Sequence, residues 1–349
     1  MLPVLAETAY PDSAPGARVR LGDFVPFLAD CGVGLSVRPN LTNREYAVVI
    51  SPGSPAGKAR VLGAGAARLI RDHRIEDGQV SMIHRLRSLL PLPGIDPPRH
   101  LDVYDFDDAL FVGSTMEENR KFAWLKREAG RWHSYTKKAK LVLAGSRYLA
   151  DRASEHSSRV EVVPSCVDPS IQPLRIHGDV ERVRIGWIGS QSTAAYLNQL
   201  LPVFEKLNAR GREFELVTVG AGDQLQAEWA ESHPWTRESE KGFLASFDIG
   251  IMPLPDDPWT RGKCGYKLLQ YFSAGVPAIA SPVGANLEIL GPDRGRFASS
   301  EAEWLEALEA LILDSATRRE MGANARSFVE ENYSYQRWAP RLAEMLRSI

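Results

Sequence analysis

The chain has 349 residues, of which 44% are hydrophobic and 25% charged, and its formal net charge is −2. At roughly 150 residues per domain, this length predicts two globular domains. The charges form no polycationic half, which argues against a nucleic-acid binder. The three cysteines, Cys31, Cys166 and Cys264, are far apart and lack metal-ligand spacing. They therefore predict neither a disulfide framework nor a zinc site.

The sequence favours a cytoplasmic protein. Its first 15 residues lack the basic and apolar regions of a secretory signal, and no apolar run approaches the roughly 20 residues of a membrane-spanning helix.

Short apolar strands alternate with helical patterns in the first half of the chain. This is the order of a parallel βαβ sheet. A segment with three prolines and no periodicity, residues 164–179, follows and predicts a linker. The expected strands are 2–7, 33–38, 46–51, 79–84, 101–106, 140–145 and 160–165, and the clearest helices are 17–30, 58–72 and 117–138.

The alternation restarts after the linker, so we expect two Rossmann-like domains that face each other across a cleft. Their predicted ranges are 1–170 and 171–334, and a final helix, 335–349, is expected to cross back to the first domain. The helical tail repeats apolar residues at helical spacing from Trp304 to Ile312, which indicates core packing. The expected strands are 183–190, 214–222, 247–254 and 276–282, and the expected helices are 193–208, 265–274, 300–314, 316–334 and 335–349.

The segment from Pro253 to Leu290 carries the clearest chemistry. It places Arg261, Lys263 and Lys267 around the start of a predicted helix. Backbone N–H groups and the helix dipole favour an anion at such a helix start, so the pattern suits a diphosphate. The alternative is that the three cations are simply solvated in a loop.

Several motifs together resemble retaining glycosyltransferases of family 4, which have the GT-B fold. They are the glycine loop at 10–20, "YDFDDALF" at 104–111, "IGWIGS" at 185–190, the segment 261–289 and the tail 319–339. The resemblance implies transfer of a sugar, with retention, from a nucleotide diphosphate sugar in the second domain to an acceptor hydroxyl in the first. The donor is a co-substrate, and neither a cofactor nor a metal is implied.

The resemblance also implies a donor site in which Lys267 is the main cation. Two acidic positions of the family correspond here to Gly262 and Gln270, and small polar residues replace an Arg and a Lys after "IGWIGS". Arg261 or Lys263 would then support Lys267. The expected donor-binding residues are Gly16, Arg18, Gly189, Ser190, Gly220, Arg261, Lys263, Lys267, Leu268 and Gln270.

On the acceptor side the candidates are His84, Asp107 and Asp108, with Asp107 expected to act catalytically beside Lys267. Asp105 and Asp107 form a DxD pattern, which chelates a divalent cation in another glycosyltransferase fold, but the resemblance puts it in the acceptor domain. Alternatively, the aspartates cap a helix and His84 is an ordinary polar residue. A carboxylate at Asp107 would also steer a cationic acceptor.

Residues Arg120 to Lys140 form a basic amphipathic stretch that predicts either peripheral contact with an anionic membrane or an ordinary solvated face. Two other functions stay open on the same fold: a non-catalytic nucleotide-sugar binding protein and a nucleotide-sugar epimerase. The sequence does not determine the donor base, the sugar or the oligomeric state. It also leaves open whether the acceptor is a surface polysaccharide, a lipid-linked molecule or a small molecule.

Overall fold

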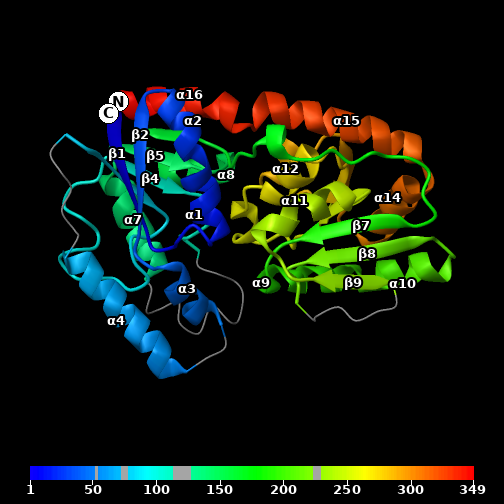
Figure 1. Cartoon of the computed structure of the whole chain (residues 1–349), viewed down its shortest axis with the longest axis horizontal. Helices are drawn as coiled ribbons and strands as arrows, with labels where there is room; N and C mark the ends of the chain where they lie inside the picture. Colours follow the sequence, from blue (N-terminus) through cyan, green and yellow to red (C-terminus); the bar gives the residue numbers. More distant parts are fainter. Residues whose placement is uncertain (52–53, 72–77, 113–126, 223–228) are drawn as a thin grey trace. The chain divides into compact units, whose positions relative to one another are not determined.

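The computed structural model describes residues 1–51, 54–71, 78–112, 127–222 and 229–349, and it divides into two compact units. The first unit comprises Met1–Cys166, Gly262–Cys264 and Tyr335–Ile349, and the second comprises Val167–Arg261 and Gly265–Ser334. Each unit contains a six-stranded sheet (Figure 1), and every strand pairing is parallel. The predicted α/β class with two Rossmann-like domains is therefore confirmed.

The first sheet has the strand order β2-β1-β3-β4-β5-β6. Its register aligns Thr8 with His84 and His84 with Asp105, so polar residues from β1, β3 and β4 meet at one carboxyl edge. The strands are β1 (Leu2–Thr8), β2 (Val33–Pro39), β3 (Val80–His84), β4 (Val103–Phe106), β5 (Leu141–Ala144) and β6 (Val160–Val162). The helices are α1 (Pro15–Arg20), η1 (Gly22–Phe24), α2 (Val25–Asp30), α3 (Asn43–Ile50), α4 (Pro55–Arg71), α7 (Glu128–Lys138) and α8 (Arg147–Ser154).

The strand expected at 46–51 is wrong, because residues 46–50 lie in the helix α3 and Ser51 caps its end. Thr42 and Glu45 form a capping box in which the Thr42 hydroxyl accepts from the Glu45 N–H at 3.2 Å and the Glu45 carboxylate accepts from the Thr42 N–H at 2.8 Å. No residue of α3 is buried, so sheet packing does not oppose this local signal. The helix expected at 17–30 is also divided, into α1, η1 and α2. Part of the helix expected at 117–138 lies outside the described residues.

The second sheet has the order β12-β11-β10-β7-β8-β9. Its edge strands β9 and β12 were not expected from the sequence. The strands are β7 (Val183–Ile188), β8 (Phe214–Val219), β9 (Ala230–His233), β10 (Ile249–Met252), β11 (Ala278–Ala280) and β12 (Gly295–Phe297). The helices are η2 (Pro169–Ile171), α9 (Gln191–Ala194), η3 (Ala195–Leu200), α10 (Leu201–Ala209), α11 (Arg237–Ser246), η4 (Thr260–Gly262), α12 (Tyr266–Ser273), α13 (Asn286–Ile289), α14 (Glu301–Leu313) and α15 (Ser315–Asn332).

Both units have an apolar core beneath their helices. The apolar stripe of α14, from Trp304 to Ile312, packs into the core of the second unit, as its spacing predicted. The last helix, α16 (Tyr335–Arg347), packs in the first unit, where the Tyr335 hydroxyl donates to the Val19 carbonyl at 3.2 Å and its ring meets Phe24 edge to face. Among the residues that the structure describes, none of the helices has both the length and the apolarity to cross a membrane.

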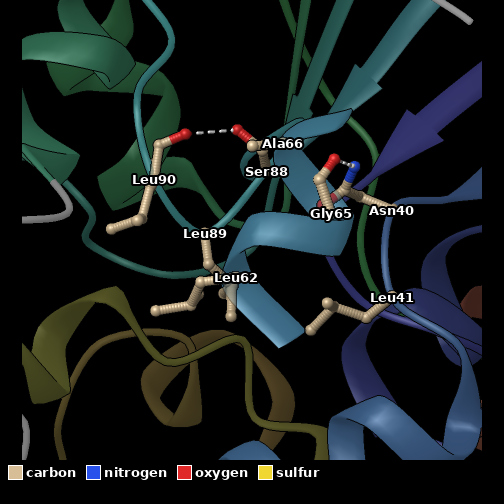
Figure 2. A pocket seen from close by; sticks show the side chains of 8 residues that line it. All are labelled: Asn40, Leu41, Leu62, Gly65, Ala66, Ser88, Leu89 and Leu90. Carbon is tan, nitrogen blue, oxygen red and sulfur yellow. Dashed lines mark hydrogen bonds between the residues drawn. The ribbon is translucent and has the colours of Figure 1, made fainter. Parts of the chain in front are cut away.

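A small, mainly apolar cavity lies beside α4 in the first unit (Figure 2). The Ser88 hydroxyl and the Asn40 amide at its wall already donate to backbone carbonyls, of Leu90 and Gly65. None of the predicted site residues lines it, so we treat it as a packing feature. Its lining residues are Asn40, Leu41, Leu62, Gly65, Ala66, Ser88, Leu89 and Leu90.

Candidate active site

Two glycine turns meet at the carboxyl ends of β7 and β8 in the second unit. The Gly189 N–H donates to the Val219 carbonyl at 3.0 Å, and the Gly220 N–H donates to the His233 carbonyl at 2.8 Å. Gly220 has a φ of +82°, and a Cβ there would lie 2.2 Å from the Gly189 carbonyl oxygen. Only glycine fits at Gly220, which lies at the carboxyl edge where α/β sheets commonly bind ligands.

Lys267 lies beside these turns, in the first turn of α12. Its Nζ is 5.4 Å from the ring centroid of the buried Trp187, and a Cβ at Gly189 would lie 3.0 Å from the Lys267 Cε. The helix begins after Gly265, whose φ is +66°. A cation, a helix start and a glycine turn thus converge at one strand end, which is a favourable arrangement for a phosphate anion.

The other donor-side candidates have different surroundings. Arg261 pairs with Asp256 at 2.6 Å, and Lys263 pairs with Asp108 at 2.7 Å. The Ser190 hydroxyl bonds the Ser192 hydroxyl at 2.9 Å. The side chains of Leu268 and Gln270 are buried, so Leu268 in the apolar core offers a ligand nothing but its backbone.

Gly262 has no room for a side chain. A Cβ there would lie 2.5 Å from the Ala109 Cβ and 2.9 Å from the Ala109 backbone nitrogen. An acidic residue at this position would therefore displace the backbone that follows Asp107 and Asp108. A close contact with the Ala109 backbone therefore explains why no carboxylate can stand at this position in the chain.

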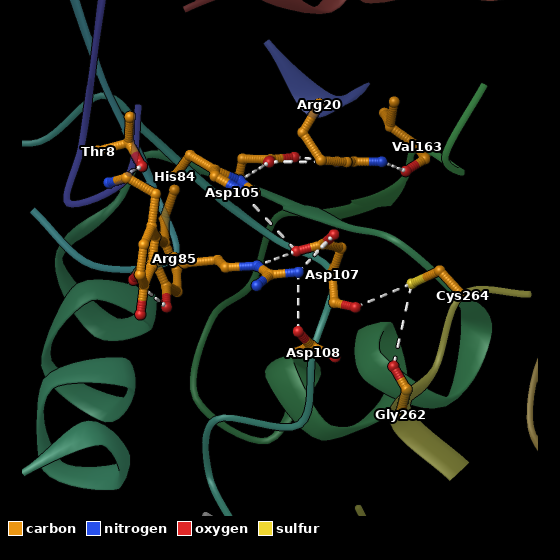
Figure 3. Close-up of polar contacts among 12 residues, drawn as sticks. Thr8, Arg20, His84, Arg85, Asp105, Asp107, Asp108, Val163, Gly262 and Cys264 are labelled. Carbon is orange, nitrogen blue, oxygen red and sulfur yellow. Dashed lines mark hydrogen bonds and ion pairs between the residues drawn. The ribbon is translucent and has the colours of Figure 1, made fainter. Parts of the chain in front are cut away.

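A group of charged side chains lies at the carboxyl ends of β3 and β4, and we call it the strand-end cluster (Figure 3). It brings together all three acceptor-side candidates. Its members are Arg20, His84, Arg85, Asp105, Asp107, Asp108 and Lys263.

The buried layer of the cluster centres on Asp105. Its carboxylate accepts from the Arg20 Nε at 3.2 Å and from the His84 Nδ1 at 2.6 Å. Burial raises the pKa of Asp105, but the Arg20 charge and the His84 hydrogen bond outweigh burial and hold that pKa below its usual value. The His84 Nε2 is buried without a hydrogen-bond partner among the described residues, 3.9 Å from the Asp107 Oδ1.

The outer layer centres on Arg85, which follows β3 with a φ of 55°. Its Nε and Nη2 donate to the two oxygens of Asp107, and its Nη2 lies 2.7 Å from the Asp108 Oδ2. Burial alone would raise the pKa of Asp107. The charge and hydrogen bonds of Arg85 have the larger effect and hold that pKa well below its usual value. Asp107 therefore stays ionised and fixed in orientation.

These contacts bear on the two alternatives for the aspartates. Asp105 and Asp107 bind protein cations, as does Asp108, and the described residues contain no group of three or more His, Cys, Asp or Glu side chains that could hold a metal. The three carboxylates bond to cations, not to the N–H groups of a described helix.

Arg85 is a member of the strand-end cluster that was not expected from the sequence. A Cβ at Gly16 would lie 2.8 Å from the Arg85 Nη2, so the guanidinium packs directly on the glycine loop. The expected cation there was Arg18, but Arg18 is buried and lies 3.5 Å from Asp23. The available signal was the position of Arg85 directly after a strand-end histidine.

Residues 182–314 match the model of a protein family described as Glycosyl transferases group 1. The second unit carries a glycosyl transferases group 1 domain. The match covers the strands and helices that hold Gly189, Gly220 and Lys267. It confirms the predicted class of enzyme, a glycosyltransferase that uses a nucleotide-sugar donor. A search of curated proteins finds no match.

Solved structures resemble the whole chain. Sucrose-phosphate synthase from Thermosynechococcus elongatus matches with a TM-score of 0.71 and 12% identity, over 99% of this chain and 98% of that one. HepE from Anabaena, in complex with UDP and glucose, matches with a TM-score of 0.64 and 12% identity over 100% of both chains. WaaG, a glycosyltransferase of lipopolysaccharide biosynthesis, matches with a TM-score of 0.62 and 14% identity, over 98% of this chain and 99% of that one. The similarity confirms the GT-B fold.

Proposed function

We propose that the chain transfers a sugar from a nucleoside diphosphate sugar to an acceptor hydroxyl, with retention of anomeric configuration and without a metal ion. The second unit would hold the donor at the carboxyl ends of β7 and β8, and the first unit would hold the acceptor at the strand-end cluster. The predicted ranges 1–170 and 171–334 correspond to these two roles.

The placement of Lys267 is the observation that carries this proposal. Cleavage of the bond between the sugar and the diphosphate leaves negative charge on the diphosphate and positive charge on the sugar. A lysine held over the Trp187 ring at the start of α12 can stabilise the leaving group as its charge grows. The departing phosphate can itself take the acceptor proton, so no protein nucleophile is required.

Asp107 and Asp108 would bind hydroxyl groups on the acceptor side. Arg85 and Lys263 hold both carboxylates in place by direct ion pairs. Because no side chain fits at Gly262, these carboxylates would take over the role of the family's missing acidic residue. Asp107 would orient the reacting hydroxyl, with His84 beneath it.

The same contacts support the proposed metal independence. The DxD carboxylates Asp105 and Asp107 are already neutralised by Arg20 and Arg85, and Lys267 would supply the positive charge that a divalent ion otherwise provides.

Membrane contact through Arg120 to Lys140 stays a prediction, as does a cytoplasmic location. Residues 113–126 lie outside the described residues. Within the described part, Arg131 is buried against Asp96, and Lys140 pairs with Asp102 at 2.8 Å. Arg131 therefore contributes nothing to a basic surface, whereas the side chain of Lys140 is 51% exposed although it pairs with Asp102.

The proposal is tested by thermal-shift screening of UDP, GDP, TDP and ADP sugars, followed by an assay of sugar release. UDP sugars come first because HepE was solved with UDP and glucose. A bound donor at a hundred times its Kd adds about 2.7 kcal/mol of stability. Saturable binding without release of sugar would instead identify a binding protein, and a changed sugar on intact nucleotide would identify an epimerase.

A further inference from the structure

We propose that the strand-end cluster recognises an acceptor without net charge that presents neighbouring hydroxyl groups, as a neutral saccharide does. This inference rests on the proposed function and names the acceptor class for the same site. It follows from the charge balance of the cluster, from the groups that its outer layer exposes, and from the rigidity of that layer.

The Asp side chains of the cluster and its Arg and Lys side chains carry equal numbers of opposite charges. Three carboxylates, those of Asp105, Asp107 and Asp108, face three cations in direct ion pairs. A charged acceptor would lose its hydration and gain no net opposite charge in return. An uncharged acceptor avoids this cost.

The outer layer exposes hydrogen-bonding edges of both kinds. The side chains of Arg85, Asp107 and Asp108 are 23%, 10% and 12% exposed. The Arg85 Nη1 has no hydrogen-bond acceptor among the described residues, and Figure 3 shows it apart from both carboxylates. Each ionised carboxylate has about four lone-pair positions, more than its protein donors occupy. One hydroxyl can accept from Nη1 while its neighbour donates to a carboxylate.

These edges are also fixed in place. Arg85 has a left-handed backbone conformation that is uncommon for a residue with a side chain, and its guanidinium is held between Gly16 and the two carboxylates. A preorganised site loses little side-chain entropy when a flexible polyol binds. The arrangement therefore suits recognition by hydrogen-bond geometry and not by attraction between charges.

This account changes one expectation from the sequence. A free carboxylate at Asp107 would have attracted a cationic acceptor, such as an amino sugar. Because Arg85 already neutralises Asp107, the wild-type cluster has no such preference. Removal of one cation from the cluster should create a preference for a cationic acceptor, and removal of one carboxylate a preference for an anionic acceptor.

The test uses the full chain and matched methyl glycosides of glucose, galactose and mannose in neutral, 6-carboxylate and 2-amino forms. Their affinities are measured by ligand-observed NMR. The wild type should bind a neutral member more tightly than its two charged counterparts. Arg85→Met leaves an excess carboxylate and should shift the affinity ratio roughly tenfold toward the amino form, whereas Asp108→Asn should shift it similarly toward the acid.

Arg152→Met is the matched control, because Arg152 pairs with Glu155 on the exposed face of α8 and lies outside the cluster. It should leave all ratios unchanged. If Arg85→Met does not fold, the affinity ratios of Asp108→Asn alone test the inference. Preference of the wild type for a charged form, failure to bind any neutral form, or unchanged ratios in the folded variants would overturn the inference. Donor hydrolysis is assayed on the same samples, so loss of the transferase proposal would be seen separately.

Discussion

Gly262 illustrates how one residue can depend on a contact far away in the sequence. Gly262→Ala would place a Cβ 2.5 Å from the Ala109 Cβ and near rigid backbone, so we expect a loss of about 1–3 kcal/mol and a lower Tm. Gly63→Ala is the control, because nothing lies within 4 Å of a Cβ at that helical position. A Tm for Gly262→Ala equal to that of the wild type would show that the contact with Ala109 is not tight.

Asp107 can be tested by removing its charge alone. Asp107→Asn weakens the pairing with Arg85, so we expect a moderately lower Tm and turnover reduced by about 10²-fold, the low end for loss of a preorganised electrostatic group. Sugar transfer and thermal unfolding are measured together, with the exposed Asp151→Asn as control. Normal transfer by the folded Asp107→Asn variant would make Asp107 a purely structural residue.

Only some residues of the candidate site could be predicted from the sequence. The sequence singled out Lys267, His84 and the aspartates because each follows a strand or begins a helix. It missed Arg85 and its contact with Gly16, since 69 positions of chain separate them and no spacing rule connects them. Nor could it show that Lys263 pairs with Asp108.

At the scale of elements, α14 offers a direct test of local signals. The Ser300 hydroxyl accepts from the Glu303 N–H at 3.3 Å, and the Glu303 carboxylate accepts from the Ser300 N–H at 2.9 Å. Ser300→Ala should destabilise the second unit by about 0.5–2 kcal/mol, measured by thermal or urea unfolding. The neighbouring Ser299→Ala is the control, because only its backbone N–H takes part in the cap. Equal stability of the two variants would contradict this account.

The sequence predicted the central strands well because they are buried on both faces and read as continuous apolar runs. The edge strands β9 and β12 escaped prediction, since their residues are few and mostly exposed or half-buried. The error at α3 has the opposite origin. There a short, β-rich apolar run suggested a strand, but a capping box and solvent exposure favoured a helix.

At the scale of the whole molecule, the account predicts catalysis without a divalent cation. Sugar release and transfer should continue at the same rate in excess EDTA, because protein cations already neutralise Asp105 and Asp107 and Lys267 faces the donor phosphates in our proposal. Loss of activity in EDTA that manganese or magnesium restores would return the two aspartates to the metal-ligand interpretation.

The central claim is that the second unit activates a nucleoside diphosphate sugar through Lys267. The most direct measurement is the rate of nucleoside diphosphate release by Lys267→Ala, compared with the wild type and with Lys206→Ala, which removes an exposed lysine of the same unit. We expect Lys267→Ala to keep its fold and to lower turnover by about 10²- to 10³-fold, as for loss of a preorganised charge-stabilising group, with Lys206→Ala unchanged. Turnover by Lys267→Ala close to that of the wild type would contradict the account.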